Sequence, residues 1–167
     1  MKNHINFLLL LFSTVLFSQE IIFPESFIID SDVLEHYSLP EDIGSPNPSL
    51  IENANNINTE GVFSIQAKRI YYMVFIKNME ELIESNKIEG NEDFLLITVS
   101  ELSTEYIEDL LKNSSHLTND NDDSILLVVD KYAILIQYAK SNKNDAEKLA
   151  DYYKNKVGAM IISLGSK

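Results

Sequence analysis

The 167-residue chain contains no cysteine, and its five glycines are scattered along it. The absence of cysteine excludes a disulfide, a thiol nucleophile, a cysteine-based zinc site and a lipid-modified cysteine. The scattered positions of the glycines exclude a glycine-rich loop that would bind a phosphate group. Positive charge is also scarce, since 13 Lys and Arg face 26 Asp and Glu and give a formal net charge of −13. Such a charge disfavours binding to nucleic acid or anionic lipid and favours cations or a basic partner.

Residues 1–18 have the pattern of a secretory signal peptide. Lys2 and His4 precede an apolar run from Ile5 to Phe17, and Ser18 is followed by polar residues. Because a bilayer span needs about 20 apolar residues, we expect cleavage after Ser18 rather than a retained anchor. No later run is long enough to span a membrane. The sequence therefore predicts an exported protein, periplasmic or secreted, with no stable membrane insertion after the leader is removed.

Residues 19–60 differ in composition from the rest of the chain. They contain no Lys or Arg, all four prolines, and an asparagine-rich run from Asn53 to Asn58. This mixture favours turns and extended chain over a packed core. We predict an acidic, loosely structured arm with one short helix near Asp32 to Ser38. The domain boundary then falls near Glu60, and an α/β domain occupies residues 61–167.

Residues 62–88 fit two different patterns. Apolar side chains recur at helical spacing at Ile65, Tyr72, Phe75, Met79 and Leu82. The uninterrupted run from Ile70 to Ile76, rich in β-branched and aromatic residues, is equally typical of a strand. We favour a long amphipathic helix through Ser85. The alternative is a strand that ends near Lys77, followed by a short helix.

The segment from Phe94 to Asn113 predicts a strand followed by a helix. Phe94 to Val99 is an apolar run of strand length. Ser103 is a suitable N-cap for a helix from about Thr104 to Asn113. Leu102 and Ile107 occupy the two positions of a hydrophobic staple around that cap.

The remaining sequence predicts a hairpin and a last helix. Ser124 to Val129 and Tyr132 to Tyr138 are two apolar runs separated only by Asp130 and Lys131, which indicates a tight turn. A capping-box variant at Asn144 to Glu147 begins a helix that ends at Gly158. Residues 159–164 add a final strand or a terminal extension.

Both hairpin strands are apolar at successive positions, so both of their faces should be covered. The expected fold is therefore an α/β three-layer sandwich with a mixed sheet, in which the core order is strand, helix, strand, hairpin strand, helix.

This order, between about residues 79 and 158, resembles the TPM domain family. The segments that carry the resemblance run from Phe94 to Asp109 and from Asp122 to Gln137. In two turns the chain has Asp123-Ser124 and Asp130-Lys131 where the family usually has Asn-Gly and Asp-Arg, and residues 139–141 replace glycines. The resemblance implies an exported or organelle-lumen protein that assists assembly or repair of membrane complexes. It also implies, for some members, divalent cations or phosphatase activity.

The candidate metal site is the loop from Asn119 to Asp123. Asp120, Asp122 and Asp123 provide three carboxylates, and Ca²⁺ takes about six to eight oxygen ligands. The loop is not an EF-hand, because Lys131 stands at the twelfth position counted from Asp120. The competing interpretation is a solvated polar turn, since Asn and Asp dominate turns for local hydrogen-bonding reasons.

Hydrolytic chemistry has little support in the sequence. His36 and His116 lie in polar surroundings, and there is no nucleophile-elbow or paired-histidine zinc motif. No catalytic residue is therefore assigned, and Ca²⁺ is the one cofactor considered.

Three functional classes follow. The favoured one is an exported accessory or binding protein of TPM-like type without a catalytic site. The second is a divalent-metal-dependent phosphatase that uses Asp120, Asp122 and Asp123. The third is an inhibitor or immunity-like protein whose acidic residues 20–60 cover a basic partner. In the first and third classes the partner is another protein.

Overall fold

The computed structural model describes residues 20–30, 32–38, 49–52, 67–78, 84, 94–113 and 123–162. In this part of the chain, seven strands form one sheet with the order β1-β3-β4-β6-β5-β7, and β2 also pairs with β3. The strands are β1 (Tyr37–Ser38), β2 (Ser49–Glu52), β3 (Arg69–Lys77), β4 (Phe94–Glu101), β5 (Ser124–Val129), β6 (Tyr132–Tyr138) and β7 (Met160–Ile162). The helices are α3 (Thr104–Asn113), α4 (Lys143–Val157) and the short 3₁₀ segments η1 (Glu25–Phe27) and η6 (Lys140–Asn142).

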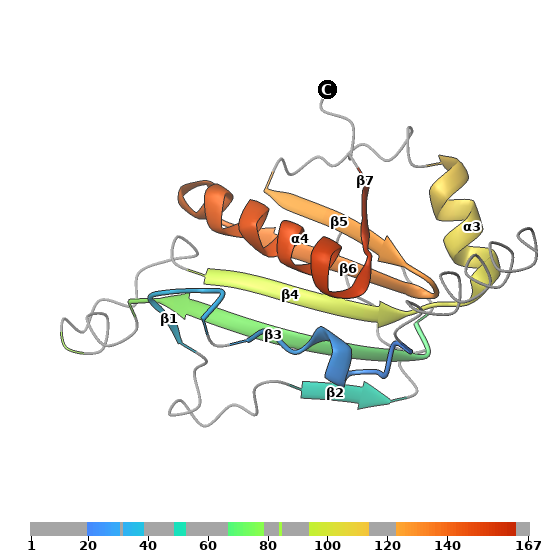
Figure 1. Cartoon of the computed structure of the whole chain (residues 1–167), viewed down its shortest axis with the longest axis horizontal. Coiled ribbons are helices and arrows are strands. Elements are labelled where there is room, and N and C mark those ends of the chain that lie inside the picture. The colour runs from blue at the N-terminus through green and yellow to red at the C-terminus, as the bar shows by residue number, and fades with distance from the viewer. Residues whose placement is uncertain are drawn as a thin grey trace, which may run out of the picture.

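Figure 1 shows α4 lying across one face of this sheet. Buried residues of α3 join the core cluster on the other face, which confirms the expected α/β sandwich. α4 packs on one face through Ala146, Leu149, Ala150 and Tyr153. α3 packs on the opposite face, where Ile107 and Leu110 join a second cluster of buried residues. Side chains alternate along each strand, so Leu127 belongs to the first cluster while its neighbours Leu126 and Val128 belong to the second. All the strand pairings described are antiparallel.

The helix favoured for residues 62–88 is wrong, because Arg69–Lys77 is strand β3. It pairs along nearly its whole length with β4, from Arg69 opposite Glu101 to Ile76 opposite Phe94. Tyr71, Met73 and Phe75 point to the α4 face, whereas Ile70 belongs to the cluster on the α3 face. Strand β3 therefore carries apolar residues on both of its faces. A continuous apolar run of this kind can also be read as helical spacing. The alternative strand ending near Lys77 is confirmed.

The loosely structured arm is wrong for residues 20–38. Phe23, Phe27 and Leu34 are buried in the same cluster as α4. The ring of Phe23 stacks on Tyr132 with centroids 5.4 Å apart, and Phe27 meets Tyr132 edge to face at 5.0 Å. These few large apolar side chains outweigh the acidic composition that suggested a solvated arm.

The short helix expected at residues 32–38 is also wrong. The segment is a turn that leads into strand β1, and His36 adopts a positive φ of 68° within it. The peptide bond before Pro24 is cis. The predicted leader and the boundary near Glu60 lie outside the described residues.

From Phe94 onward the sequence predicted the elements well. The β4 strand, helix α3 and both hairpin strands have the expected positions. Ser103 accepts a hydrogen bond at Oγ from the amide of Tyr106 at 3.3 Å, which confirms the N-cap. α4 begins at Lys143, so Asn144 lies within the helix and is not its cap. Gly158 ends α4 in the left-handed conformation, with φ of 72°, and β7 follows as the final strand.

Candidate functional site

The most buried carboxylate in the described part of the chain is Glu101, which is 5% exposed at the end of β4. Its Oε2 accepts a hydrogen bond from Arg69 Nε at 2.5 Å, and its Oε1 contacts Lys131 Nζ at 2.6 Å. The sheet register places Arg69 and Tyr132 opposite Glu101 on the two neighbouring strands. Lys131 comes from the β5–β6 turn. Its backbone carbonyl accepts a hydrogen bond from Leu102 N at 2.8 Å.

The charges around Glu101 serve the fold. Burial alone would raise the pKa of Glu101, but the hydrogen bonds from Lys131 and Arg69 and their positive charges outweigh it and lower the pKa. Arg69 also lies over the ring of Phe23, 4.5 Å from its centroid. The carboxylate thus joins β4 to β3 and to the β5–β6 turn, and both of its oxygens are occupied. Arg69 extends this cluster to Phe23 of the N-terminal segment.

A second carboxylate, Asp145, ties the first turn of α4 to the far edge of the sheet. Its Oδ2 accepts hydrogen bonds from Lys77 Nζ at 3.1 Å and from the Tyr37 hydroxyl at 3.0 Å. Although partial burial would raise the pKa of Asp145, these bonds and the positive charges of Lys77 and Lys148 lower it. Tyr37 belongs to β1 and Lys77 to β3, so this cluster also holds separate elements together.

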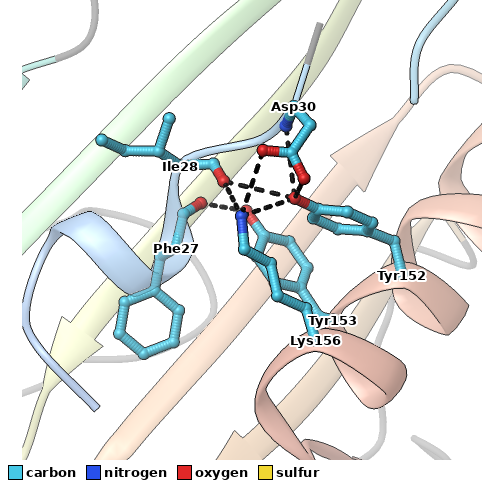
Figure 2. A network of polar contacts seen from close by, with 6 residues as sticks. All are labelled: Phe27, Ile28, Asp30, Tyr152, Tyr153 and Lys156. Atoms are coloured by element: carbon cyan, nitrogen blue, oxygen red, sulfur yellow. Dashed lines mark hydrogen bonds and ion pairs between the residues drawn. The ribbon is translucent and has the colours of Figure 1, made fainter. Parts of the chain in front are cut away.

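The third cluster, drawn in Figure 2, fastens residues 27–30 to the second half of α4. The hydroxyl of Tyr152 donates to Asp30 Oδ2 at 2.7 Å and accepts a hydrogen bond from Lys156 Nζ at 2.6 Å. Lys156 also donates to the carbonyl of Ile28 at 2.7 Å. The Tyr153 hydroxyl, on the buried side, donates to the carbonyl of Phe27 at 2.8 Å.

A tyrosine and a lysine one helical turn apart can form an acid and base pair, but here burial raises the pKa of Tyr152 and keeps its hydroxyl protonated. The hydrogen bond from Tyr152 lowers the pKa of Asp30, so the carboxylate stays charged. Lys156 is directed to Ile28 and Asp30. The three side chains therefore form a latch between chain segments.

A groove of about 500 Å³ lies on the α4 face at the β7 edge of the sheet. Its helix wall carries Lys143, Glu147 and Asp151, at successive turns of α4. Its sheet wall is formed by Ser124, Ile125, Tyr138, Ile161 and Ile162. The volume is within the range of natural ligand sites, about 300–1,000 Å³.

The charged pair on the helix wall of the groove is only weakly engaged. Lys143 Nζ and Glu147 Oε1 are 4.0 Å apart, with side chains 64% and 56% exposed. Such an exposed pair contributes little to stability, about 0.3–0.5 kcal/mol. Met160 and Ile161, on the adjoining edge strand, are exposed by 53% and 43%. The groove therefore combines open carboxylates with exposed apolar surface.

The residues predicted as metal ligands are only partly within the described structure. Asp120 and Asp122 lie outside it, while Asp123 precedes β5 and its carbonyl accepts a hydrogen bond from Tyr138 N at 3.0 Å. Among the described residues there is no group of three His, Asp or Glu arranged to hold a metal ion. The calcium hypothesis stays a prediction. His36 is exposed, and His116 lies outside the described residues.

Sequence reasoning missed the clusters around Glu101 and Asp30, because their partners are distant in the chain. Glu101 and Arg69 are 32 residues apart, and Asp30 and Tyr152 are 122 apart. The spacing of Lys143, Glu147 and Asp151 along one helical face was the one local signal for the groove.

No protein-family model matches the chain, and neither a curated protein nor a solved structure matches it significantly. The resemblance to the TPM domain therefore stays a prediction. Within the described segments, no helix combines the length and apolar character needed to cross a membrane.

Proposed function

We propose that this protein is an exported accessory protein that acts by binding another protein at the groove between α4, β5 and β7. The main support for this proposal is a contrast between the carboxylates of the protein. The carboxylates of Glu101, Asp145 and Asp30 are occupied by lysine, arginine and tyrosine groups of the same chain. Glu147 and Asp151, by contrast, border a groove that is open to solvent beside exposed Ile161.

The edge position of β7 also supports a binding role. It ends the strand order of the described sheet, and its pairing there is with β5. Proteins commonly protect such edges with charges or a proline, whereas Met160 and Ile161 are apolar. An apolar sheet edge beside a groove is a natural place for a partner to dock.

Site-specific photocrosslinking in the cells that produce the protein tests this proposal. A photoreactive phenylalanine analogue replaces Ile161 in one variant and Leu111 in a control. Leu111 is also exposed, by 37%, but lies on α3. We expect a discrete higher-mass adduct from position 161 and none from position 111. Equal labelling from both positions, or no adduct from position 161, would contradict the proposal.

A further inference from the structure

The chemistry of the groove indicates what kind of segment fits it, and this inference rests on the proposed function. Its sheet wall includes the apolar residues Ile125 of β5 and Ile161 of β7, and its helix wall includes the acidic residues Glu147 and Asp151. A side chain that matches both surfaces needs a long apolar stem and a positively charged end. Lys and Arg have this form, and they commonly lay the stem on apolar surface while the charge stays in water.

The main chain of the partner is constrained by β7. An edge strand presents unpaired N–H and C=O groups that an extended segment can pair with. In such a segment alternate side chains point to the same face of the sheet. One set of side chains would therefore face α4 and the groove, while the other set would face the side of Met160, whose register partner Val128 belongs to the α3-face cluster.

We infer that the groove binds an extended segment of a partner protein in which Lys or Arg alternates with apolar residues, added as a strand beside β7. The cationic side chains lie along the groove, with their stems on Ile125 and Ile161 and their charges beside Glu147 and Asp151. The net charge of −13 steers a segment of this sign toward the protein. Lys143 stands at one end of the same wall, so the acidic residues Glu147 and Asp151 occupy its middle and its other end.

The test uses three labelled eight-residue peptides and fluorescence anisotropy at about 0.15 M salt, where exposed charges more than about 8 Å apart are largely screened. The first peptide alternates Val and Lys, the second alternates Val and Glu, and the third has the composition of the first in two blocks. We expect the alternating Val-Lys peptide to bind at least tenfold more tightly than either of the others. Amide exchange of β7 should slow when it binds.

Two double variants with the same change in net charge separate a specific site from general attraction. Glu147→Lys with Asp151→Lys should weaken binding of the Val-Lys peptide at least tenfold. Glu105→Lys with Glu108→Lys, on the exposed face of α3, should leave it within about twofold. Equal weakening by both variants, equal binding of the block peptide, or no binding at all would overturn the inference. If the Val-Glu peptide binds as well as the Val-Lys peptide and also protects β7, the binding surface stands and the preference for a basic segment is wrong.

The crosslinking experiment fails separately from this one. An adduct from position 161 that persists in the Glu147→Lys, Asp151→Lys background would retain the binding role while removing the carboxylates from recognition. If the adduct from position 161 forms in the parent background and is lost in the Glu147→Lys, Asp151→Lys background, the two carboxylates contribute to binding of the cellular partner.

Discussion

Tyr153, near the end of α4, donates its hydroxyl hydrogen to the carbonyl of Phe27, which lies 126 residues earlier in the chain. The tyrosine side chain is fully buried, and burial raises its pKa well above the usual value. Phe27 is equally buried and packs against Tyr132 of β6. The bond thus joins the first described segment of the chain to the last helix within the core.

Replacing Tyr153 with Phe removes that donor and leaves the Phe27 carbonyl without its tyrosine partner. We expect a loss of about 1–3 kcal/mol in the free energy of unfolding, as for other buried groups that lose a hydrogen bond. Tyr152→Phe is the matched control, since Tyr152 is half-buried and Asp30 and Lys156 are partly solvated. Urea unfolding of the two variants should show the larger loss for Tyr153→Phe. An equal or smaller loss would contradict a structural role for the buried bond.

Phe27→Ala tests whether the N-terminal segment belongs to the folded domain. Truncation of a fully buried phenylalanine costs about 3–5 kcal/mol through lost burial and a residual cavity. Ile22→Ala, at a side chain 57% exposed in the same segment, should change stability by less than about 0.5 kcal/mol. Both values come from urea unfolding of the mature protein. A small effect of Phe27→Ala would show that this segment does not contribute to the core in solution.

The cluster formed by Glu101, Arg69 and Lys131 predicts a pH dependence of stability. The pKa of Glu101 is lowered from the ordinary value of 4.5, so its contribution is complete above that pH and is lost as the pH falls through the lower, folded-state pKa. We expect Glu101→Gln to reduce stability by about 1–3 kcal/mol near neutral pH, because hydrogen bonds to charged groups are lost while Arg69 and Lys131 can still reach water.

Measurement of unfolding by urea at about pH 7, 4.5 and 3 checks this prediction. The parent should lose stability more steeply than Glu101→Gln between the two lower values, and the two proteins should converge. Parallel curves would show that other carboxylates, such as Asp145, account for the acid sensitivity.

Gly158 gives a test of the end of α4. A Cβ added there meets no heavy atom within 4 Å, so crowding does not oppose a substitution. Its φ of 72° is nevertheless left-handed, and we expect Gly158→Ala to lower stability by about 1–2 kcal/mol from backbone strain. Gly158→Asn should cost less, because asparagine tolerates this conformation. Thermal unfolding of the two variants gives the comparison, and equal stability of parent and Gly158→Ala would contradict it.

The sequence predicted those elements whose signals are local. The Ser103 cap, the two-residue turn at Asp130 and the Gly158 stop each depend on neighbouring residues, and each lies where it was expected. It failed where burial is decided by distant segments. The strand character of β3 depends on flanking strands, and the burial of Phe23 depends on Tyr132, which the composition of residues 19–60 does not reveal.

The candidate site shows the same division. The helical spacing of Lys143, Glu147 and Asp151 is visible in the sequence, but the groove exists only because β7 returns beside β5 and places Ile161 opposite that wall. Asp120 and Asp122, which belong to the predicted calcium loop, lie outside the described residues. The spacing of the charges on α4 was not predicted to be a site, and the groove was found only in the structure, where the return of the chain supplies its other wall.

The latch of Asp30, Tyr152 and Lys156 also sets an order of events during synthesis. Asp30 leaves the ribosome 122 residues before Tyr152, which at about 5–20 residues per second is an interval of about 6–24 s. Until α4 is made, Phe23 and Phe27 have no helix to pack against, and the strands already made lack α4 on that face. The domain is completed only when its two ends meet, so a nascent chain lacking α4 exposes aromatic surface that the finished protein hides.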